Sequence, residues 1–189
     1  MTGTPGTGKT TLSRLLSSAL GATHIDLSEY SKENGLILTE DHDRETSVVD
    51  IEKLSHELNK IVKRANDYIV LDGHYAHDVV KSTYVWKVLV LRRAPWLLKV
   101  DLERRGYSSE KIRENVEAEI MGVCVNESLS SFPVGKVCEI DTTDKSPEES
   151  LSEALSSLRD EKNCEGERID WLTYEETLKL LRDENVHNR

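Results

Sequence analysis

Residues 3–11 have the types and spacing of a phosphate-binding loop. They read Gly-Thr-Pro-Gly-Thr-Gly-Lys-Thr-Thr and contain the pattern G-x4-G-K-T. In such a loop the backbone N–H groups surround phosphate oxygens, the lysine reaches the β- and γ-phosphates, and the hydroxyl residue after it holds Mg²⁺. The pattern predicts a site for ATP with Mg²⁺, in which Lys9 is catalytic and Thr10 is a metal ligand. The residues expected to bind the nucleotide are Gly6, Thr7, Gly8, Lys9, Thr10 and Thr11.

A second set of polar residues follows a short apolar run. Residues 68–71 read as a buried strand, and Asp72, Gly73 and His74 come directly after it. An acidic residue at the end of such a strand is where a phosphate-loop enzyme keeps its second contact to Mg²⁺, so Asp72 is a candidate metal and catalytic residue. At His74 a neutral imidazole can orient a water or relay a proton, although a lone histidine is as often structural.

A basic segment, which is expected to attract phosphate, supplies the third candidate. Residues 92–113 contain seven lysines and arginines against three acidic residues, and Arg105 and Gly106 fall in a turn between two expected helices. Phosphoryl transfer depends on positioning and on neutralised charge, so an arginine beside a glycine hinge can close over the nucleotide as part of a lid. Arg105 is the candidate for this role. The alternative is an arginine that only complements the dipole at a helix C-terminus.

The elements that must position these residues alternate between strands and helices. Apolar runs predict strands at residues 22–27, 68–72, 86–91 and 137–141. Helical periodicity predicts helices at residues 11–20, 50–65, 95–104, 109–129 and 147–158. This alternation predicts an α/β fold with a doubly wound parallel sheet flanked by helices. After a polar linker, an amphipathic helix is expected near the C-terminus, with Trp171 as its anchor.

The loop lacks the strand that normally precedes it. A phosphate-binding loop usually follows a buried central strand, and only Met1 and Thr2 precede Gly3. The first strand is therefore expected to be truncated, with a loss of roughly five buried apolar side chains at about 1.5–3 kcal/mol each. We predict that the natural protein has about five apolar residues upstream of Thr2. The chain as written should then melt less cooperatively than one extended by such a strand.

Composition limits the class of protein. The chain has 189 residues, three cysteines without metal-ligand spacing and a net charge of −10. With no apolar run long enough for a membrane span, these features predict one soluble domain in a reducing compartment, cytoplasmic or, in a eukaryote, nuclear. The cysteines are expected to be thiols rather than bridges. The net charge argues against broad nucleic-acid binding, and residues 26–57, with ten acidic residues against three basic, would attract a basic partner.

Together these motifs resemble one family, the small archaeal and eukaryotic adenylate kinases of the isoenzyme 6 type, also called coilin-interacting nuclear ATPase proteins. The resemblance covers Thr2 to about Leu158, and the tail around Trp171 is similar to archaeal members. The segments that carry it are residues 2–11, 71–74, 90–92, 103–107 and 111–120.

The resemblance implies a nucleoside monophosphate kinase with sheet order 2-3-1-4-5. The kinase domain would span residues 1–160, with an acceptor arm at about 26–49 and a lid at about 104–114, and residues 161–189 would form the linker and C-terminal helix. The implied reaction converts ATP and AMP to two ADP, with ATPase activity linked to His74. A role in small ribosomal subunit maturation and rRNA processing is also implied. Where the family often has an arginine, this chain has Asp101, so phosphate clamping would depend on Arg104.

Three functions are open at this point. One is a nucleoside monophosphate kinase of broad specificity, which the arginine-rich lid fits. Another is an assembly factor that uses ATP to dock and release a basic small-subunit ribosomal protein with little kinase turnover, which the acidic segment fits. A kinase for a small metabolite such as shikimate or gluconate shares the loop but lacks support from residues 72–74 and 105–107. The sequence does not rank AMP against CMP or dAMP as acceptor.

Overall fold

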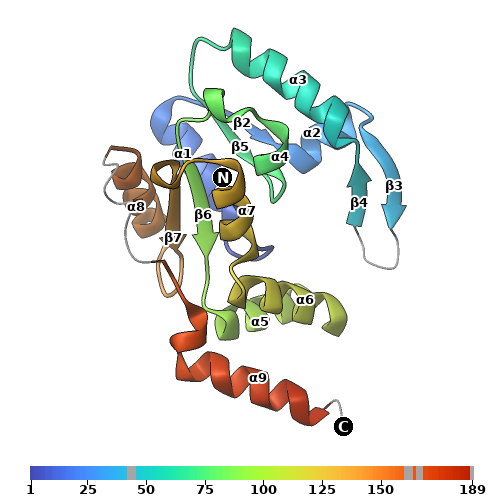
Figure 1. The fold of residues 1–189 in the computed structure, drawn as a ribbon, viewed down its shortest axis with the longest axis vertical. Coiled ribbons are helices and arrows are strands. Elements are labelled where there is room, and N and C mark those ends of the chain that lie inside the picture. The colour runs from blue at the N-terminus through green and yellow to red at the C-terminus, as the bar shows by residue number, and fades with distance from the viewer. Residues whose placement is uncertain (42–45, 160–163, 165–167, 188–189) are drawn as a thin grey trace.

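The computed structural model describes residues 1–189 except 42–45, 160–163, 165–167 and 188–189. Strands and helices alternate along much of the described chain (Figure 1). In order, the strands and α-helices are β1 (Thr2–Gly3), α1 (Lys9–Leu20), β2 (Thr23–Asp26), α2 (Leu27–Glu33), β3 (Ile37–Asp41), β4 (Thr46–Val49), α3 (Ile51–Arg64), β5 (Ile69–Asp72), α4 (Ala76–Val79), β6 (Val88–Arg92), α5 (Pro95–Arg104), α6 (Ser109–Ile120), α7 (Val123–Ser131), β7 (Val137–Asp141), α8 (Pro147–Arg159) and α9 (Glu175–His187).

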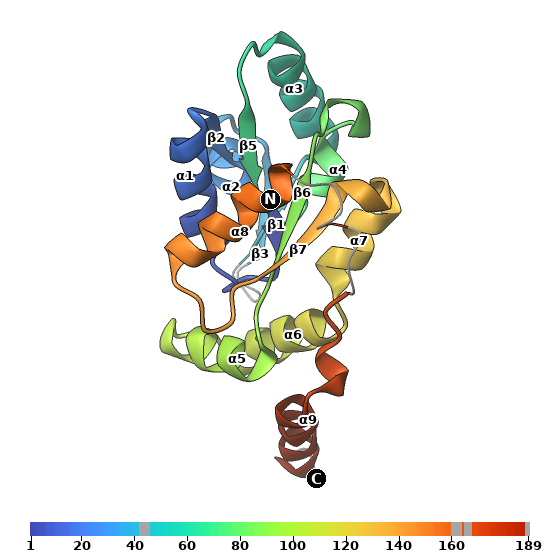
Figure 2. The same cartoon turned by 90° about the vertical axis from the view of Figure 1, so that its left-hand side faces the viewer.

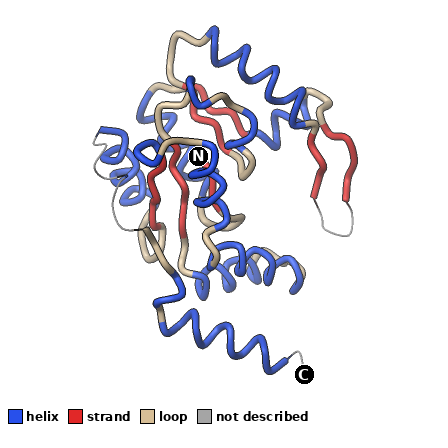
Figure 3. The backbone as a smooth tube through the Cα atoms, viewed as in Figure 1, coloured by secondary structure: helices blue, strands red, loops and turns tan. Residues whose placement is uncertain are grey.

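Parallel strands form the centre of the fold in two hydrogen-bonded groups (Figure 3). β2 pairs with β5, and β6 lies between β1 and β7. Met1 joins the two groups, because its ammonium donates to the carbonyl of Leu71 over 2.5 Å and its carbonyl accepts from the N–H of Gly73 over 3.2 Å. The strands therefore follow the order β2-β5-β1-β6-β7, which corresponds to the expected 2-3-1-4-5 once the β3–β4 hairpin is set aside.

The central strand is short, as expected from the sequence. β1 contains two residues, which lie opposite Val90 and Leu91 of β6. Upstream of it, a largely apolar cavity of about 290 Å³ separates β5 from β6. Its lining includes Met1, Val70, Leu71, Val88 and Leu89. The cavity thus lies between residues of the two hydrogen-bonded groups of strands.

Helices cover both faces of the sheet (Figure 2). Leu12 and Leu16 of α1 share one hydrophobic cluster with Leu89 of β6, and α8 packs beside α1 on this face. Val125 of α7 shares another cluster with Val88. Alternate residues of β6 therefore face opposite layers, as the period of a strand buried on both faces requires. The prediction of an α/β fold with helices on both sides of a parallel sheet is confirmed.

The predicted strands correspond to β2, β5, β6 and β7, but one predicted helix is wrong. Residues 109–129 form two helices, since α6 ends at Ile120 and α7 begins at Val123. Gly122 has a φ of 61°, in the left-handed region, and its N–H donates to the carbonyl of Glu119. A glycine in this conformation ends a helix, so the chain changes direction here despite the continuing apolar periodicity.

An arm extends from the sheet between β2 and β5 (Figure 1). It consists of α2, the antiparallel β3–β4 hairpin and α3, and its core contains the fully buried Leu27, Leu54 and Leu58. The expected acceptor arm at residues 26–49 therefore contains a helix and a hairpin that the sequence did not predict. Residues 42–45, part of its acidic stretch, lie outside the described residues.

Cys138 and Cys164 form a disulfide, so the prediction of three thiols is wrong for this pair. Cys138 lies in β7, and Cys164 follows α8, which packs back onto β7. The fold brings the two residues together across 26 positions of sequence, a proximity that cysteine spacing alone does not indicate. Cys124 in α7 is a free cysteine, as expected.

The C-terminal segment returns to the helices beside the predicted lid. Trp171 is 1% exposed, which agrees with its expected role as an anchor. α9 then packs on α5, with Leu180 beside the cluster that contains Leu98 and Leu102 (Figure 1). Within the part of the chain that the structure describes, no helix combines the length and the apolar character needed to cross a membrane.

Candidate active site

The predicted phosphate-binding loop connects β1 to α1. Gly6 and Gly8 have φ angles of 96° and 92°, the left-handed conformation expected for them. α1 begins at Lys9, and Gly8 caps it without a side-chain hydrogen bond. The N–H groups of the first helical turn lack intrahelical partners, so this end of α1 offers donors to an anion such as phosphate.

Gly6 also sets the distance between the loop and α5. A Cβ atom at this position would lie 2.7 Å from Cδ1 of Leu98, so a larger residue would push the two apart. α5 carries Arg104 in its last turn, and Arg105 is its C-terminal cap. Close packing at Gly6 therefore holds the base of the predicted lid against the loop.

The side chain of Lys9 folds back over its own loop. Its Nζ donates to the carbonyl of Gly3 over 2.7 Å and to the carbonyl of Thr4 over 3.0 Å. Burial lowers the pKa of Lys9, and the neighbouring carboxylate of Asp72 partly raises that pKa again. The amine thus lies at the loop, close enough to Asp72 for the two charges to interact.

Asp72 lies at the carboxyl end of β5, is 3% exposed and faces α1. The hydroxyl of Ser13 donates to its Oδ2 over 2.9 Å, and Nε2 of His24 lies 3.7 Å from the same oxygen. Ser13 comes about one helical turn after Thr10, which is exposed at the start of α1. A carboxylate and a hydroxyl in this position are hard oxygen donors, so the residues present fit Mg²⁺.

His74 lies two residues after the end of β5 and is partly exposed to solvent. Its ring stands edge-on to the ring of Tyr75, and its carbonyl accepts a hydrogen bond from the hydroxyl of Thr2 over 3.1 Å. Partial burial of the imidazole and then the charge of Lys9 lower the pKa of His74. The imidazole is therefore neutral near pH 7 and able to accept a proton, as the predicted role in hydrolysis requires.

A cavity of about 350 Å³ lies between the loop and the C-terminal end of α5. Gly6, Gly8 and Thr11 line one side of it, and Arg104 and Arg105 line another. The structure thus brings Arg105 to the space beside the loop, where the lid prediction places it. Because Arg105 also caps α5, its position is equally compatible with the alternative of a helix-terminal arginine.

The lining of this cavity also includes Arg93, Thr142 and Lys145, which were not predicted as site residues. Arg93 and Thr142 directly follow β6 and β7. The carboxyl ends of parallel strands meet at one edge of a sheet, and ligands of α/β proteins bind there. That rule, applied to β6 and β7 as it was to β5, identifies both residues from the sequence.

Asp101 holds cations in place rather than clamping phosphate. Its carboxylate pairs with Arg93 over 2.8 Å and with Arg104 over 3.7 Å. Nη1 of Arg93 also donates to the carbonyl of Thr142 over 2.9 Å, which fixes the guanidinium at the cavity wall. One acidic residue therefore orients two of the cations that border the cavity.

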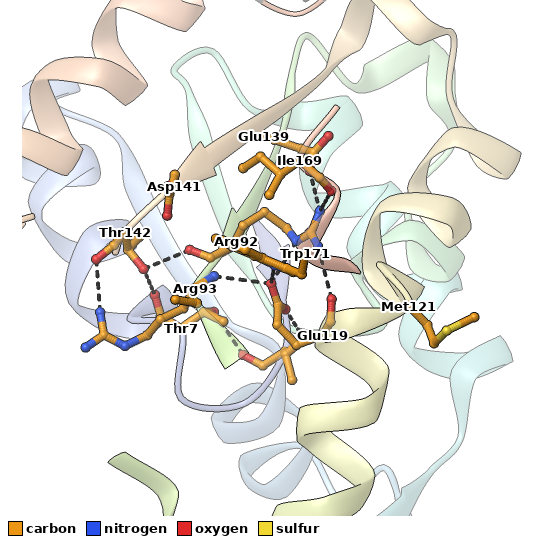
Figure 4. A network of polar contacts seen from close by, with 12 residues as sticks. Thr7, Arg92, Arg93, Glu119, Met121, Glu139, Asp141, Thr142, Ile169 and Trp171 are labelled. Carbon is orange, nitrogen blue, oxygen red and sulfur yellow. Dashed lines mark hydrogen bonds and ion pairs between the residues drawn. The ribbon is translucent and has the colours of Figure 1, made fainter. Parts of the chain in front are cut away.

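Arg92 departs from the expectation that residues 92–113 attract phosphate. It is 2% exposed and pairs with Glu119 and Glu139 (Figure 4). Its charge is thus neutralised inside the protein, and the prediction is wrong for this residue. The strand period buries Arg92 at the end of β6, whereas Arg93 one position later reaches the cavity.

The fold and the loop define a P-loop kinase. Residues 1–122 match the family model described as an AAA domain. A shikimate kinase from Bacteroides thetaiotaomicron has this fold, with a TM-score of 0.56 and 18% identity over 84% of this chain and 95% of that one. A sugar kinase from Janibacter sp. gives a TM-score of 0.52 and 14% identity over 84% and 91% of the two chains. At these identities the likeness concerns the fold alone and does not favour a small-metabolite substrate.

The chain belongs to the family of archaeal proteins that carry the name "Putative adenylate kinase". The protein from Methanocaldococcus jannaschii is 39% identical over 171 residues, which cover 90% of both chains. The protein from Thermococcus kodakarensis is 37% identical over 183 residues, which cover 96% of this chain and 97% of that protein. This membership confirms the adenylate kinase class of enzyme that the sequence motifs predicted.

Proposed function

We propose that the chain is an adenylate kinase that transfers the γ-phosphoryl group of ATP to AMP, with ATPase activity besides. The observation that carries this proposal is the shared cavity beside the loop, which Gly6 and Gly8 border together with Arg105. A phosphate chain seated there would meet the donors of the loop on one side and a guanidinium on the other. The name of the relatives supports the same reaction.

The loop residues and the strand end would act together on ATP. The N–H groups from Gly6 to Thr11 would bind the phosphates, and the ammonium of Lys9, held at the carbonyls of its loop, would stabilise the charge on the β- and γ-phosphates. Mg²⁺ held by Thr10 and Asp72 would supply further neutralisation of the phosphate charge. Arg105, carried by a lid at about residues 104–114, would neutralise charge on the group in transit.

The arm would hold the acceptor, which we assign to AMP or another nucleoside monophosphate. A phosphate oxygen of the acceptor attacks the γ-phosphorus of ATP, and the bond from that phosphorus to the β–γ bridging oxygen breaks. Two molecules of ADP result when AMP is the acceptor. In its absence a water oriented by His74 takes the place of the acceptor, and ADP and phosphate form. The tail, residues 161–189, would take no direct part.

The identity of the acceptor is tested by initial rates of transfer from ATP to AMP, CMP and dAMP at matched concentrations. We expect AMP to be phosphorylated fastest and the others to be accepted at lower rates. If the rate of ADP formation with each of the three nucleotides equals the rate without an acceptor, the kinase proposal is wrong. Phosphate release in the same samples would then show whether ATP hydrolysis alone remains.

The surface of the arm favours a second function, the docking of a basic small-subunit ribosomal protein during ribosome maturation. Glu29, Glu33 and Glu52 are exposed on it, and the hairpin exposes Leu38 at 63% and Val48 at 49%. Exposed acidic and apolar side chains on one arm suit a basic protein partner, with attraction that weakens as salt rises. Capture of small-subunit proteins at low salt, lost at high salt, is the expected result. No capture at low salt would leave the kinase function alone.

A further inference from the structure

Glu119 is a buried carboxylate next to the loop that the proposed mechanism does not use. It lies in the last turn of α6 and is 2% exposed. Its Oε2 accepts from the hydroxyl of Thr4 over 2.6 Å. Its Oε1 accepts from Nε of Arg92 over 2.8 Å, from the indole N–H of Trp171 over 3.0 Å and from the N–H of Arg93 over 3.2 Å (Figure 4). One carboxylate therefore joins the loop, the end of β6, α6 and the C-terminal segment.

Thr4 links this carboxylate to the catalytic amine. Its hydroxyl donates to Glu119, while its carbonyl accepts from Nζ of Lys9 over 3.0 Å and from the hydroxyl of Thr7 over 2.9 Å. Thr4 is 2% exposed, so no water competes for these bonds from bulk solvent. A displacement of Thr4 would move the oxygen that holds Lys9, and this makes the position of the amine depend on Glu119.

The contacts of Glu119 are those of a hydrogen-bond acceptor. Each group directed at its two carboxylate oxygens is a hydrogen-bond donor, and the guanidinium of Arg92 also donates from Nη2 to its backbone carbonyl over 3.0 Å. A glutamine of nearly the same size accepts with one terminal atom only. Its N–H group would either face the donors on Oε1 and lose those bonds, or face Thr4, whose hydroxyl would then accept instead of donate. Glu119→Gln thus removes the charge and part of the network while it preserves the volume.

We propose that Glu119 is a positioning residue for phosphoryl transfer, which holds Thr4 and through it Lys9 in the reactive geometry. α6 begins directly after the predicted lid turn, with Ser108 as its cap, so this carboxylate connects the lid to the loop in addition to the packing at Gly6. The indole N–H of Trp171 connects the C-terminal segment to Oε1 of the same carboxylate. The inference rests on the proposed adenylate kinase function, because phosphoryl transfer is the step that Glu119 would assist.

A double-mutant cycle with Thr4→Val and Glu119→Gln tests this role. Each single variant is expected to lower kcat for ADP formation from ATP and AMP by about 10- to 100-fold, since a misplacement near 1 Å can cost about 10²-fold. KM for ATP should change much less. Because both substitutions act on the same link between Thr4 and Glu119, the double variant should be no slower than the slower single variant. Trp171→Phe, which keeps an aromatic ring but removes the N–H, should lower kcat in the same direction by a smaller factor.

The matched control is Ser157→Ala, which removes a buried hydrogen bond of 3.0 Å within α8, away from the loop. Its kcat should equal that of the parent. Losses in kcat that multiply in the double variant, or a parental kcat in Thr4→Val, would overturn the proposal. If Glu119→Gln does not fold, parental kcat values in both Thr4→Val and Trp171→Phe overturn it equally.

Amide hydrogen exchange separates this proposal from the proposed function. If the parent chain forms no ADP from ATP and AMP, the kinase function has failed, and the exchange rates of the amides of residues 4 and 6–9 decide on Glu119 instead. Faster exchange in Thr4→Val and Glu119→Gln, with no further increase in the double variant, supports positioning of the loop. Exchange equal to that of the parent contradicts it.

Discussion

The hydroxyl of Ser13 donates a hydrogen bond of 2.9 Å to Oδ2 of Asp72. This bond attaches the carboxyl end of β5 to α1 about one helical turn beyond Thr10. Thr10 and Asp72, which were predicted from separate parts of the sequence, therefore lie on two elements that are in contact. Met1, which precedes β1, donates a hydrogen bond to the carbonyl of Leu71 in β5. This bond holds the end of β5 beside the strand that leads into the loop. The oxygen donors expected to hold Mg²⁺ therefore share one end of the sheet with Lys9.

Lys9→Ala is expected to lower both transfer to AMP and hydrolysis of ATP by roughly 10³-fold or more, because the ammonium stabilises charge that grows during transfer. Initial rates of ADP and phosphate formation measure the two reactions. Lys81→Ala, an exposed lysine distant from the loop in sequence, is the control and should retain parental rates. Near-parental turnover in Lys9→Ala would show that the loop does not act on the phosphates.

His74→Ala should reduce hydrolysis of ATP more than transfer to AMP, since only hydrolysis needs a positioned water. Burial and the charge of Lys9 lower the pKa of His74, so its ring can accept a proton from such a water. Both rates are measured in one preparation, with the exposed His56→Ala as the control for loss of a histidine. Equal losses in the two reactions would indicate that His74 has a structural role instead.

The unfolding free energy of the chain should rise with pH between about 6 and 8. Burial lowers the pKa of the Met1 α-amino group from 8.0 to about 6, so the unfolded state binds more protons in this window. The gain is up to about 2–3 kcal/mol, present above pH 8 and lost below pH 6. Urea unfolding at both pH values measures it against an N-terminally acetylated control, which has no titrating amine. The same pH dependence in both samples would assign the effect to other groups.

Only Cys124 should react with iodoacetamide when the unreduced protein is unfolded in urea, because Cys138 and Cys164 form a disulfide. In the folded protein Cys124 should react slowly, since burial raises the pKa of its thiol and shields it. Mass spectrometry counts the labelled residues before and after reduction. Three labelled cysteines without reduction would show that the bridge does not form in solution.

Local patterns were sufficient to predict the loop and most of the elements. Gly6 and Gly8 have left-handed conformations and α1 begins at Lys9, because a phosphate-binding loop imposes its geometry within a few residues. Uninterrupted apolar runs likewise identified β5 and β6, and the end of β5 located Asp72. These signals depend on neighbours in sequence, so distant parts of the fold do not alter them.

The rest depends on contacts between distant segments, which periodicity does not specify. Thr4 and Glu119 are 115 positions apart, and nothing in either local sequence indicates that they share a hydrogen bond. Arg92 reads as a surface cation until two carboxylates from other elements are placed beside it. Apolar periodicity indicates which side of an element is buried, but not which residue lies opposite.

The central claim is that this chain transfers a phosphoryl group from ATP to AMP, and ADP formation by the purified protein with and without AMP tests it most directly. With Mg²⁺ and ATP, added AMP should raise ADP formation well above the hydrolytic rate, toward the roughly 1–100 s⁻¹ typical of kinases. Two ADP should form for each AMP consumed. A rate of ADP formation that AMP leaves unchanged, with one phosphate released per ADP, would contradict the claim.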